Sequence, residues 1–282
     1  MVKENIPKFQ HFISQMQLKR FTAEDGRLYV FDKRVGKVLH SAPDNLFGQN
    51  HLYTTEDMDG EKDTALEVWF SSLESRASPV LDKIIAAARA NRCPQLTTDE
   101  KQAWDLFFYM QWKRVPDVHR ALASKAETDA IIDSSLQTLR KIYPDRLGEI
   151  NELDTPIQRK RLAQGGLIRG IQIVGKAVLP ALGQRGLAIL KITASSENFA
   201  IGSLPVVRMR GNLNDPNVEA WLPIASDVAV GVGQERGKET LVGVHDPAVI
   251  QQFNRTTATQ GTTFAARSRI LIEGLVAFLQ AR

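Results

Sequence analysis

The chain has 282 residues, of which 43% are hydrophobic and 24% are charged. These proportions are typical of soluble globular proteins and exclude a disordered, collagen-like or membrane-dominated chain. The 36 Lys and Arg exceed the 32 Asp and Glu by 36 − 32 = 4, which permits an anionic partner without requiring one. Charged residues, among them Arg169 and Arg185, interrupt the most apolar stretch, residues 165–190, so we expect a cytoplasmic protein with no membrane association.

Cysteine and histidine are too sparse for a metal site of the usual kind. Cys93 is the single cysteine, and the five histidines are scattered along the sequence. A structural zinc site needs about four Cys or His ligands at close spacing. We therefore expect no metal and no cofactor.

The first 60 residues predict a β-hairpin followed by a long loop. Residues 27–31 are β-branched and aromatic, residues 32–36 have turn chemistry, and residues 37–39 return to strand-forming types. Turn formers dominate residues 45–60, where Phe47, Leu52 and Tyr53 are the expected apolar anchors.

Four helices are expected in residues 61–185. The first begins at a capping-box pattern, Thr64 to Glu67, and Pro79 should kink or restart it. The second begins at another capping box, Thr97 to Glu100, and ends before Pro116.

The third helix should cover residues 118–142 and end before Pro144. The fourth opens at Thr155-Pro156, a favoured pairing at a helix start, and carries apolar residues to about Val178.

After residue 186 the pattern changes to short strands, and the chain ends in helices. Strands are expected near residues 187–193, 199–201, 206–209, 221–224, 228–232 and 241–244. A short helix should follow Asp246-Pro247, and residues 262–280 favour a closing helix. We expect a single domain, residues 1–282, organised as 1–60, 61–185 and 186–282. The fold class is α+β, with a central helical layer packed on a small, mainly antiparallel sheet formed by N- and C-terminal strands.

Residues 10–21, QHFISQMQLKRF, contain the first candidate site residues. His11 is a candidate general base, and Lys19 and Arg20 are candidate ligands for an anion. The alternative is that His11 is a hydrogen-bonded packing residue and that the two cations are solvated.

Glu67, Glu74 and Arg114 form the second candidate group. The two glutamates are seven residues apart on the first predicted helix and therefore nearly aligned, as an acid and base pair or a cation site would require. The alternative is a solvated face that pairs with residues such as Arg76. Arg114 should lie beside the apolar face of its helix, where we expect it to be buried and paired with Glu67 or Glu74.

The usual catalytic and nucleotide-binding motifs are missing from the sequence. It has no GxxxxGK[ST], HExxH or GxSxG pattern, and the glycines at 231 and 233 lack the spacing of a dinucleotide site. His245-Asp246 and the basic run at residues 159–161 fit ordinary surface roles better than functional ones.

The opening run QHFISQMQLKRF, followed by GRLYVFDKRVGKV, resembles the start of an uncharacterised, mostly bacterial family, domain-of-unknown-function 4238. Members open with a pattern close to QHxVPQxYLxxF and a "lyvyd" strand. The resemblance extends through Glu67 and Glu74, Arg114-Val-Pro116, the elements at Pro205 and Leu222, and Phe253-Asn254. It implies a fold and adds Asn254 to the candidate ligand-binding residues, but it implies no reaction.

Two positions depart from the family pattern. Ser14 replaces a proline of the opening motif, and Ser203-Leu204 replace an Asp-Asn pair before Pro205. If those polar side chains bind substrate in relatives, this chain lacks two hydrogen-bonding groups.

Two hypotheses follow, and whether the protein is an enzyme stays open between them. In the first it is an intracellular effector whose pocket takes an anionic, phosphate-bearing ligand such as nucleic acid or a nucleotide. His11, Glu67 and Glu74 would then be catalytic, and Lys19, Arg20, Arg114 and Asn254 would bind the ligand. In the second it is a non-catalytic protein-interaction or regulatory protein with a degenerate site and a protein partner.

Overall fold

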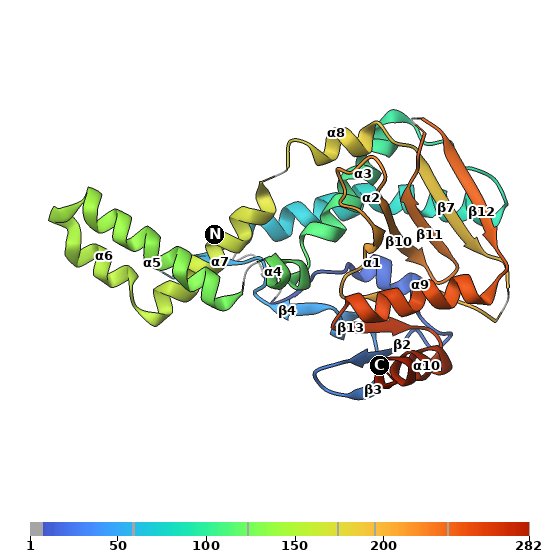
Figure 1. Cartoon of the computed structure of the whole chain (residues 1–282), viewed down its shortest axis with the longest axis horizontal. Coiled ribbons are helices and arrows are strands. Elements are labelled where there is room, and N and C mark those ends of the chain that lie inside the picture. The colour runs from blue at the N-terminus through green and yellow to red at the C-terminus, as the bar shows by residue number, and fades with distance from the viewer. Residues whose placement is uncertain are drawn as a thin grey trace, which may run out of the picture.

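The computed structural model describes residues 8–57, 60–122, 124–173, 175–194, 196–235 and 237–281. Helices and two β-sheets form the body of an α+β protein. A helical arm projects from this body at the left of Figure 1. The arm consists of α5 (Lys125–Ile142), α6 (Leu147–Leu153) and α7 (Pro156–Gln172), with a 3-10 turn, η3 (Pro144–Arg146), between the first two.

The larger sheet has five strands and is almost entirely built from the C-terminal third of the chain. Its order is β12 (Glu239–Val244), β7 (Leu187–Ile192), β11 (Val228–Val232), β10 (Glu219–Ala225) and β9 (Val207–Arg210). Only the outer pair, β12 with β7, is parallel among these described strands. Gly231 pairs with Trp221, and an added Cβ there would lie 2.5 Å from the Trp221 ring, so a side chain does not fit.

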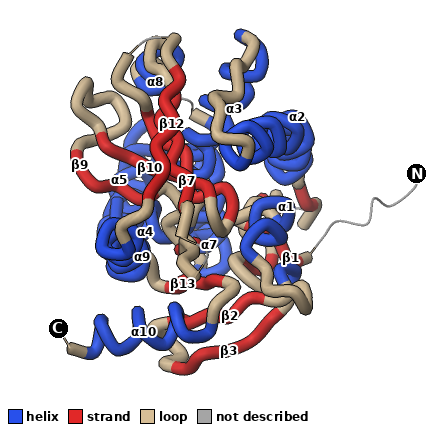
Figure 2. Tube along the Cα trace, turned by 90° about the vertical axis from the view of Figure 1, so that its right-hand side faces the viewer, coloured by secondary structure: helices blue, strands red, loops and turns tan. Residues whose placement is uncertain are grey.

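The smaller sheet joins the two ends of the chain. Its order is β3 (Lys37–Ser41), β2 (Leu28–Asp32), β13 (Thr263–Ala266) and β8 (Ile201–Gly202), all antiparallel. The helix α10 (Arg269–Gln280) contacts β2 and β13, whereas α9 (Pro247–Gln260) contacts strands of both sheets. Figure 2 shows α10 beside β2 and β3, below the larger sheet.

Helices of the middle of the chain lie against the larger sheet. The long helix α2 (Ala65–Arg89) contacts β7 and β10, and α3 (Thr98–Lys113) packs between α2 and α8 (Val178–Gly183). Figure 1 shows α2 running behind the strands of the larger sheet and α8 at the top of the view. The buried core between them contains residues from all parts of the chain, including Leu18, Phe70, Phe107, Ile189 and Val230.

Short elements of the N-terminal region complete the fold. Two small ribbons are formed by β1 (Phe9–His11) with β4 (Gly48–Asn50) and by β5 (Thr55–Glu56) with β6 (Lys62–Asp63). Single turns of helix are α1 (Gln15–Leu18), η1 (Lys19–Phe21) and η2 (Pro43–Asn45), and α4 (Pro116–Leu122) follows α3. The strands thus form two main sheets and two ribbons where one small sheet was expected.

Several local predictions are confirmed. The hairpin at residues 27–39 exists as β2 and β3, and the capping box of Thr97 with Glu100 is formed. All six strands expected after residue 186 are present near their predicted positions. The loop anchors Phe47, Leu52 and Tyr53 are buried.

At Pro79, where a kink or a restart was expected, α2 continues as one helix. Three predicted helix boundaries were wrong. The expected helix at 118–142 divides into α4 and α5 because Ser124 and Glu127 form a capping box that starts a new helix. The fourth helix ends at Gln172 rather than near residue 178.

The remaining boundary error concerns residues 262–280, which begin as the strand β13 before α10 starts. The β13 backbone pairs with β2 on one side and with β8 on the other. This pairing outweighs the local helical pattern because it satisfies the backbone hydrogen bonds of a buried segment.

Among the described residues, no helix has both the length and the apolar character needed to cross a membrane.

We expect Ser14→Pro to stabilise the protein. Ser14 has φ −61° and ψ 144°, which proline adopts without strain, and its buried hydroxyl has no hydrogen-bond partner among the described residues. The substitution restricts the unfolded chain, so the free energy of unfolding should rise by about 0.4–1 kcal/mol in a urea melt. A loss of stability would mean that the backbone of Ile13 does not tolerate a following proline.

Candidate functional site

A cavity of about 290 Å³ brings together three of the predicted site residues. His11 lies at the end of β1, and Glu67 and Glu74 lie on α2. The seven-residue spacing places both glutamates on the same face of that helix. Phe9, Gln15, Met16, Phe70 and Ser71 complete the lining.

Pairing of β1 with β4 fixes the position of His11, whose backbone lies opposite Gly48. Gly48 is required there because an added Cβ would lie 2.4 Å from the Phe9 ring. The Nε2 of His11 lies 3.2 Å from the carbonyl oxygen of Asp44. If Nε2 carries the proton and donates it to that carbonyl, Nδ1 has a free lone pair. Burial lowers the pKa of His11 and thereby favours its neutral form.

Arg114 is the charged residue that organises this region. It ends α3 with only 1% of its surface exposed. Its Nη1 donates to Glu74 Oε1 at 2.7 Å, and its Nε donates to the carbonyl oxygen of Phe12 at 2.9 Å. The guanidinium carbon lies 4.9 Å from the centre of the Phe70 ring. The prediction that Arg114 is buried and paired with one of the two glutamates is therefore confirmed.

Glu67 has a different environment from Glu74. Its Oε2 is buried and has no hydrogen-bond partner among the described residues. Burial raises the pKa of Glu67 to about 6, although Arg114 opposes the shift. The expected capping box at Thr64 is not formed, because the Thr64 side chain makes no capping hydrogen bond. The Glu67 side chain lines the cavity instead.

Four predicted site residues do not line this cavity: Arg114, described above, and Lys19, Arg20 and Asn254. Lys19 is exposed on η1, and Arg20 pairs with Asp82 at 2.7 Å. Asn254 is fully buried in α9, where its amide accepts from the backbone nitrogen of Ala200 at 2.8 Å and donates to the carbonyl oxygen of Asn198 at 2.9 Å. These contacts give Asn254 a structural role between α9 and the segment before β8.

A buried polar cluster at the start of α4 was not predicted from the sequence. The Ser203 hydroxyl donates to Asp117, which also accepts from the Thr262 hydroxyl at 2.9 Å and the Thr262 backbone nitrogen at 3.2 Å. Ser203 is one of the two departures from the family pattern. A polar group is therefore retained at that position, and it connects α4 to the smaller sheet. The departure of Ser203 from the family pattern was the sign of this cluster in the sequence.

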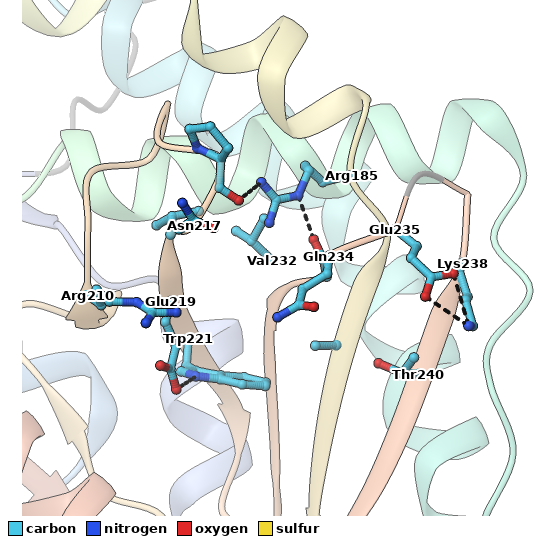
Figure 3. A pocket seen from close by; sticks show the side chains of 14 residues that line it. Arg185, Arg210, Asn217, Glu219, Trp221, Val232, Gln234, Glu235, Lys238 and Thr240 are labelled. Carbon is cyan, nitrogen blue, oxygen red and sulfur yellow. Dashed lines mark hydrogen bonds and ion pairs between the residues drawn. The ribbon is translucent and has the colours of Figure 1, made fainter.

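A second cavity, of about 570 Å³, lies beside β10, β11 and β12 and contains several charged side chains (Figure 3). Arg185 donates to the carbonyl oxygens of Pro216 and Gly233, both at 2.7 Å, and Lys238 pairs with Glu235 at 3.0 Å. The charged groups drawn with dashed lines in Figure 3 thus have partners within the protein. The His11 cavity differs because Oε2 of Glu67 is buried there and has no hydrogen-bond partner among the described residues.

In the part of the chain that the structure describes, no group of three or more His, Cys, Asp or Glu side chains is placed to hold a metal ion.

The protein therefore has an α+β body and, at its N-terminal motif, a cavity lined by a histidine and two carboxylates. The family described as "Protein of unknown function (DUF4238)" matches residues 10–269. The chain belongs to this family, as its resemblance suggested. No curated protein and no solved structure matches the chain.

Arg114→Ala should be strongly destabilising. The substitution leaves the Glu74 carboxylate and the Phe12 carbonyl without their buried partner, so we expect a loss of about 3–5 kcal/mol in chemical denaturation. Arg89→Ala is the matched control, because the Arg89–Asp227 pair is largely exposed and should contribute about 0–1 kcal/mol. Equal effects of the two substitutions would contradict the role assigned to Arg114.

Glu67→Gln should stabilise the protein in a pH-dependent way. A raised pKa means that ionisation of Glu67 opposes folding, and this cost develops between pH 4.5 and about 6 as the pH rises. With allowance for solvent screening, we expect the variant to exceed the wild type by on the order of 1 kcal/mol at pH 7. The difference should vanish near pH 4, where both side chains are neutral. Urea melts at the two pH values measure it, and a difference that is independent of pH would refute the assignment.

Proposed function

We propose that the protein is an enzyme that carries out general acid–base chemistry in the His11 cavity on a small polar substrate. The observation that carries this proposal is that His11 and Glu67 line one cavity although burial shifts their pKa values in opposite directions. The pKa of Glu67 rises to about 6, and that of His11 falls below its ordinary value of 6.5. Groups with pKa values near the working pH are the most effective proton donors and acceptors.

The roles follow from the contacts of each side chain. Neutral His11, with Nε2 held by the Asp44 carbonyl, would accept a proton from the substrate at Nδ1. Glu67, in the protonated form that burial favours, would donate a proton to the substrate. Glu74 is held by Arg114 and would orient the substrate as a hydrogen-bond acceptor. The buried guanidinium would act as a positioning group.

A phosphate-bearing ligand, the first hypothesis from the sequence, suits this cavity less well. Two carboxylates line the cavity, while Lys19 and Arg20 lie outside it. Arg114 already pairs with Glu74. A neutral substrate, or one that donates hydrogen bonds, fits these charges better than an anion does.

The alternative is a non-catalytic interaction protein in which the same residues only fasten the N-terminal segment. The bond from Arg114 to the Phe12 carbonyl favours this alternative, since it does tie that segment to α3. The half-buried position of His11 in a cavity favours the catalytic function, because a purely structural histidine has no need to face a cavity.

A thermal melt of His11→Ala distinguishes the two functions. A catalytic His11 should be dispensable for folding, so we expect a change of about 0.5 kcal/mol or less in the free energy of unfolding. A structural His11 should cost about 1–3 kcal/mol when removed, because the Asp44 carbonyl would lose its hydrogen bond and the half-buried ring would lose its packing. The second result would rule out the proposed role.

Catalysis itself is tested with chromogenic p-nitrophenyl esters, phosphates and glycosides. We expect turnover of at least one class and a loss of about 100-fold or more in both His11→Ala and Glu67→Gln. His40→Ala is the control, since His40 lies outside the cavity and faces Asp25 at 3.2 Å. Turnover that survives both cavity substitutions would place the chemistry elsewhere.

A further inference from the structure

A third cavity, of about 640 Å³, lies where the helical arm meets the body. Its walls come from α5 and α7 of the arm, from α4 with the end of α3, and from the segment at Gln49 and Leu52. Two contacts hold these walls together: Gln164 donates to the Leu52 carbonyl at 2.5 Å, and Arg161 pairs with Glu56. Its volume lies within the range of cavities that bind small organic ligands, about 300–1,000 Å³.

The lining of this cavity is apolar with basic groups at one side. Aliphatic side chains of the arm, including Ile131, Ile132 and Leu162, provide most of the surface. Arg114, Arg120 and Lys160 also line the cavity. Arg114 is paired with Glu74 and Arg120 with Asp117, but neither carboxylate is among the described residues of the lining. Ile131 is 63% exposed although it is large and aliphatic. The cavity therefore combines an exposed apolar surface with basic side chains.

The basic side chains differ in how far a ligand can reach them. Arg120 pairs with Asp117 and its side chain is 54% exposed, and Lys160 is also exposed. The Arg114 side chain pairs with Glu74 and has no accessible surface, so a ligand in the cavity does not contact its guanidinium. A head group in the cavity would therefore meet Lys160 and Arg120.

We propose that this cavity binds an amphipathic anion, a molecule with a carboxylate or phosphate head and an apolar chain or ring. The head group pairs with Lys160 and Arg120, and the apolar part lies against Ile131, Ile132 and Leu162. The inference concerns a different cavity from that of the proposed function and does not depend on it.

Gly166 offers a direct way to fill the cavity. It lies on α7 and lines the cavity, and an added Cβ at this position would meet no atom within 4 Å. Gly166→Leu should therefore occupy the ligand space without disturbing the fold. Gly170→Leu is the matched control, because Gly170 is on the same helix with the same free space but is not part of the lining.

The test is isothermal titration calorimetry with decanoate and decyl phosphate as probes. We expect at least one of them to bind with a dissociation constant below about 1 mM. Decyltrimethylammonium, which has the same chain and the opposite charge, should bind at least about tenfold more weakly, and so should acetate and inorganic phosphate, which lack the chain. The preference between the two probes identifies the head group as carboxylate or phosphate.

Substitutions locate the binding. Gly166→Leu should weaken the preferred probe at least about tenfold, while Gly170→Leu and His11→Ala should leave it within about twofold of the wild type. Retained binding in His11→Ala separates this inference from the proposed catalytic function. Equal binding of the cationic and anionic probes, unaltered binding in Gly166→Leu, or no binding of either anion at about 1 mM would each overturn the proposal.

Discussion

The buried guanidinium of Arg114 is the interaction on which the N-terminal half of the structure depends. It joins three segments that are far apart in sequence: the backbone at Phe12, the side chain of Glu74 on α2, and the end of α3. A buried charge is expensive unless its hydrogen bonds are made, so the position of each partner is constrained by the same residue. The Tyr53 hydroxyl adds a fourth segment by donating to the Arg114 carbonyl at 3.0 Å.

This arrangement explains why the opening motif contains both structural and site residues. Gln10 is fully buried, and its side chain accepts from the Tyr53 backbone nitrogen at 2.6 Å and donates to Thr54 at 2.9 Å. The next residue, His11, faces the cavity because neighbouring residues of a strand point to opposite sides. Gln17 then fastens the motif to the larger sheet through the Pro223 carbonyl at 2.9 Å. Anchors on both sides of His11 thus hold it against α2.

Arg114 also stands between two cavities of different character. Its Nη1 donates to Glu74, which lines the acidic cavity of His11, and Arg114 is also among the residues that line the apolar, basic cavity under the arm. The anionic ligand suggested by the sequence fits the cavity under the arm better than the His11 cavity, because no carboxylate is among the described residues that line it. The sequence made Arg114 a candidate ligand-binding residue, but the fold buries its side chain completely, so Lys160 and Arg120 carry the proposed contact instead.

The local elements and three residues that line the His11 cavity could be predicted from the sequence. Capping at Thr97, the hairpin turn at residues 32–36 and the strand pattern after residue 186 depend on residues a few positions apart, so they are visible in the sequence. The aligned glutamates were predicted from helical periodicity, and the burial of Arg114 from the apolar face of its helix. Three features could not be predicted: β13 is a strand, Lys19, Arg20 and Asn254 lie away from the cavity, and Ser203 binds Asp117. These features rest on contacts between residues that are distant in sequence, such as Gln17 with Pro223, and local propensity carries no information about such pairings.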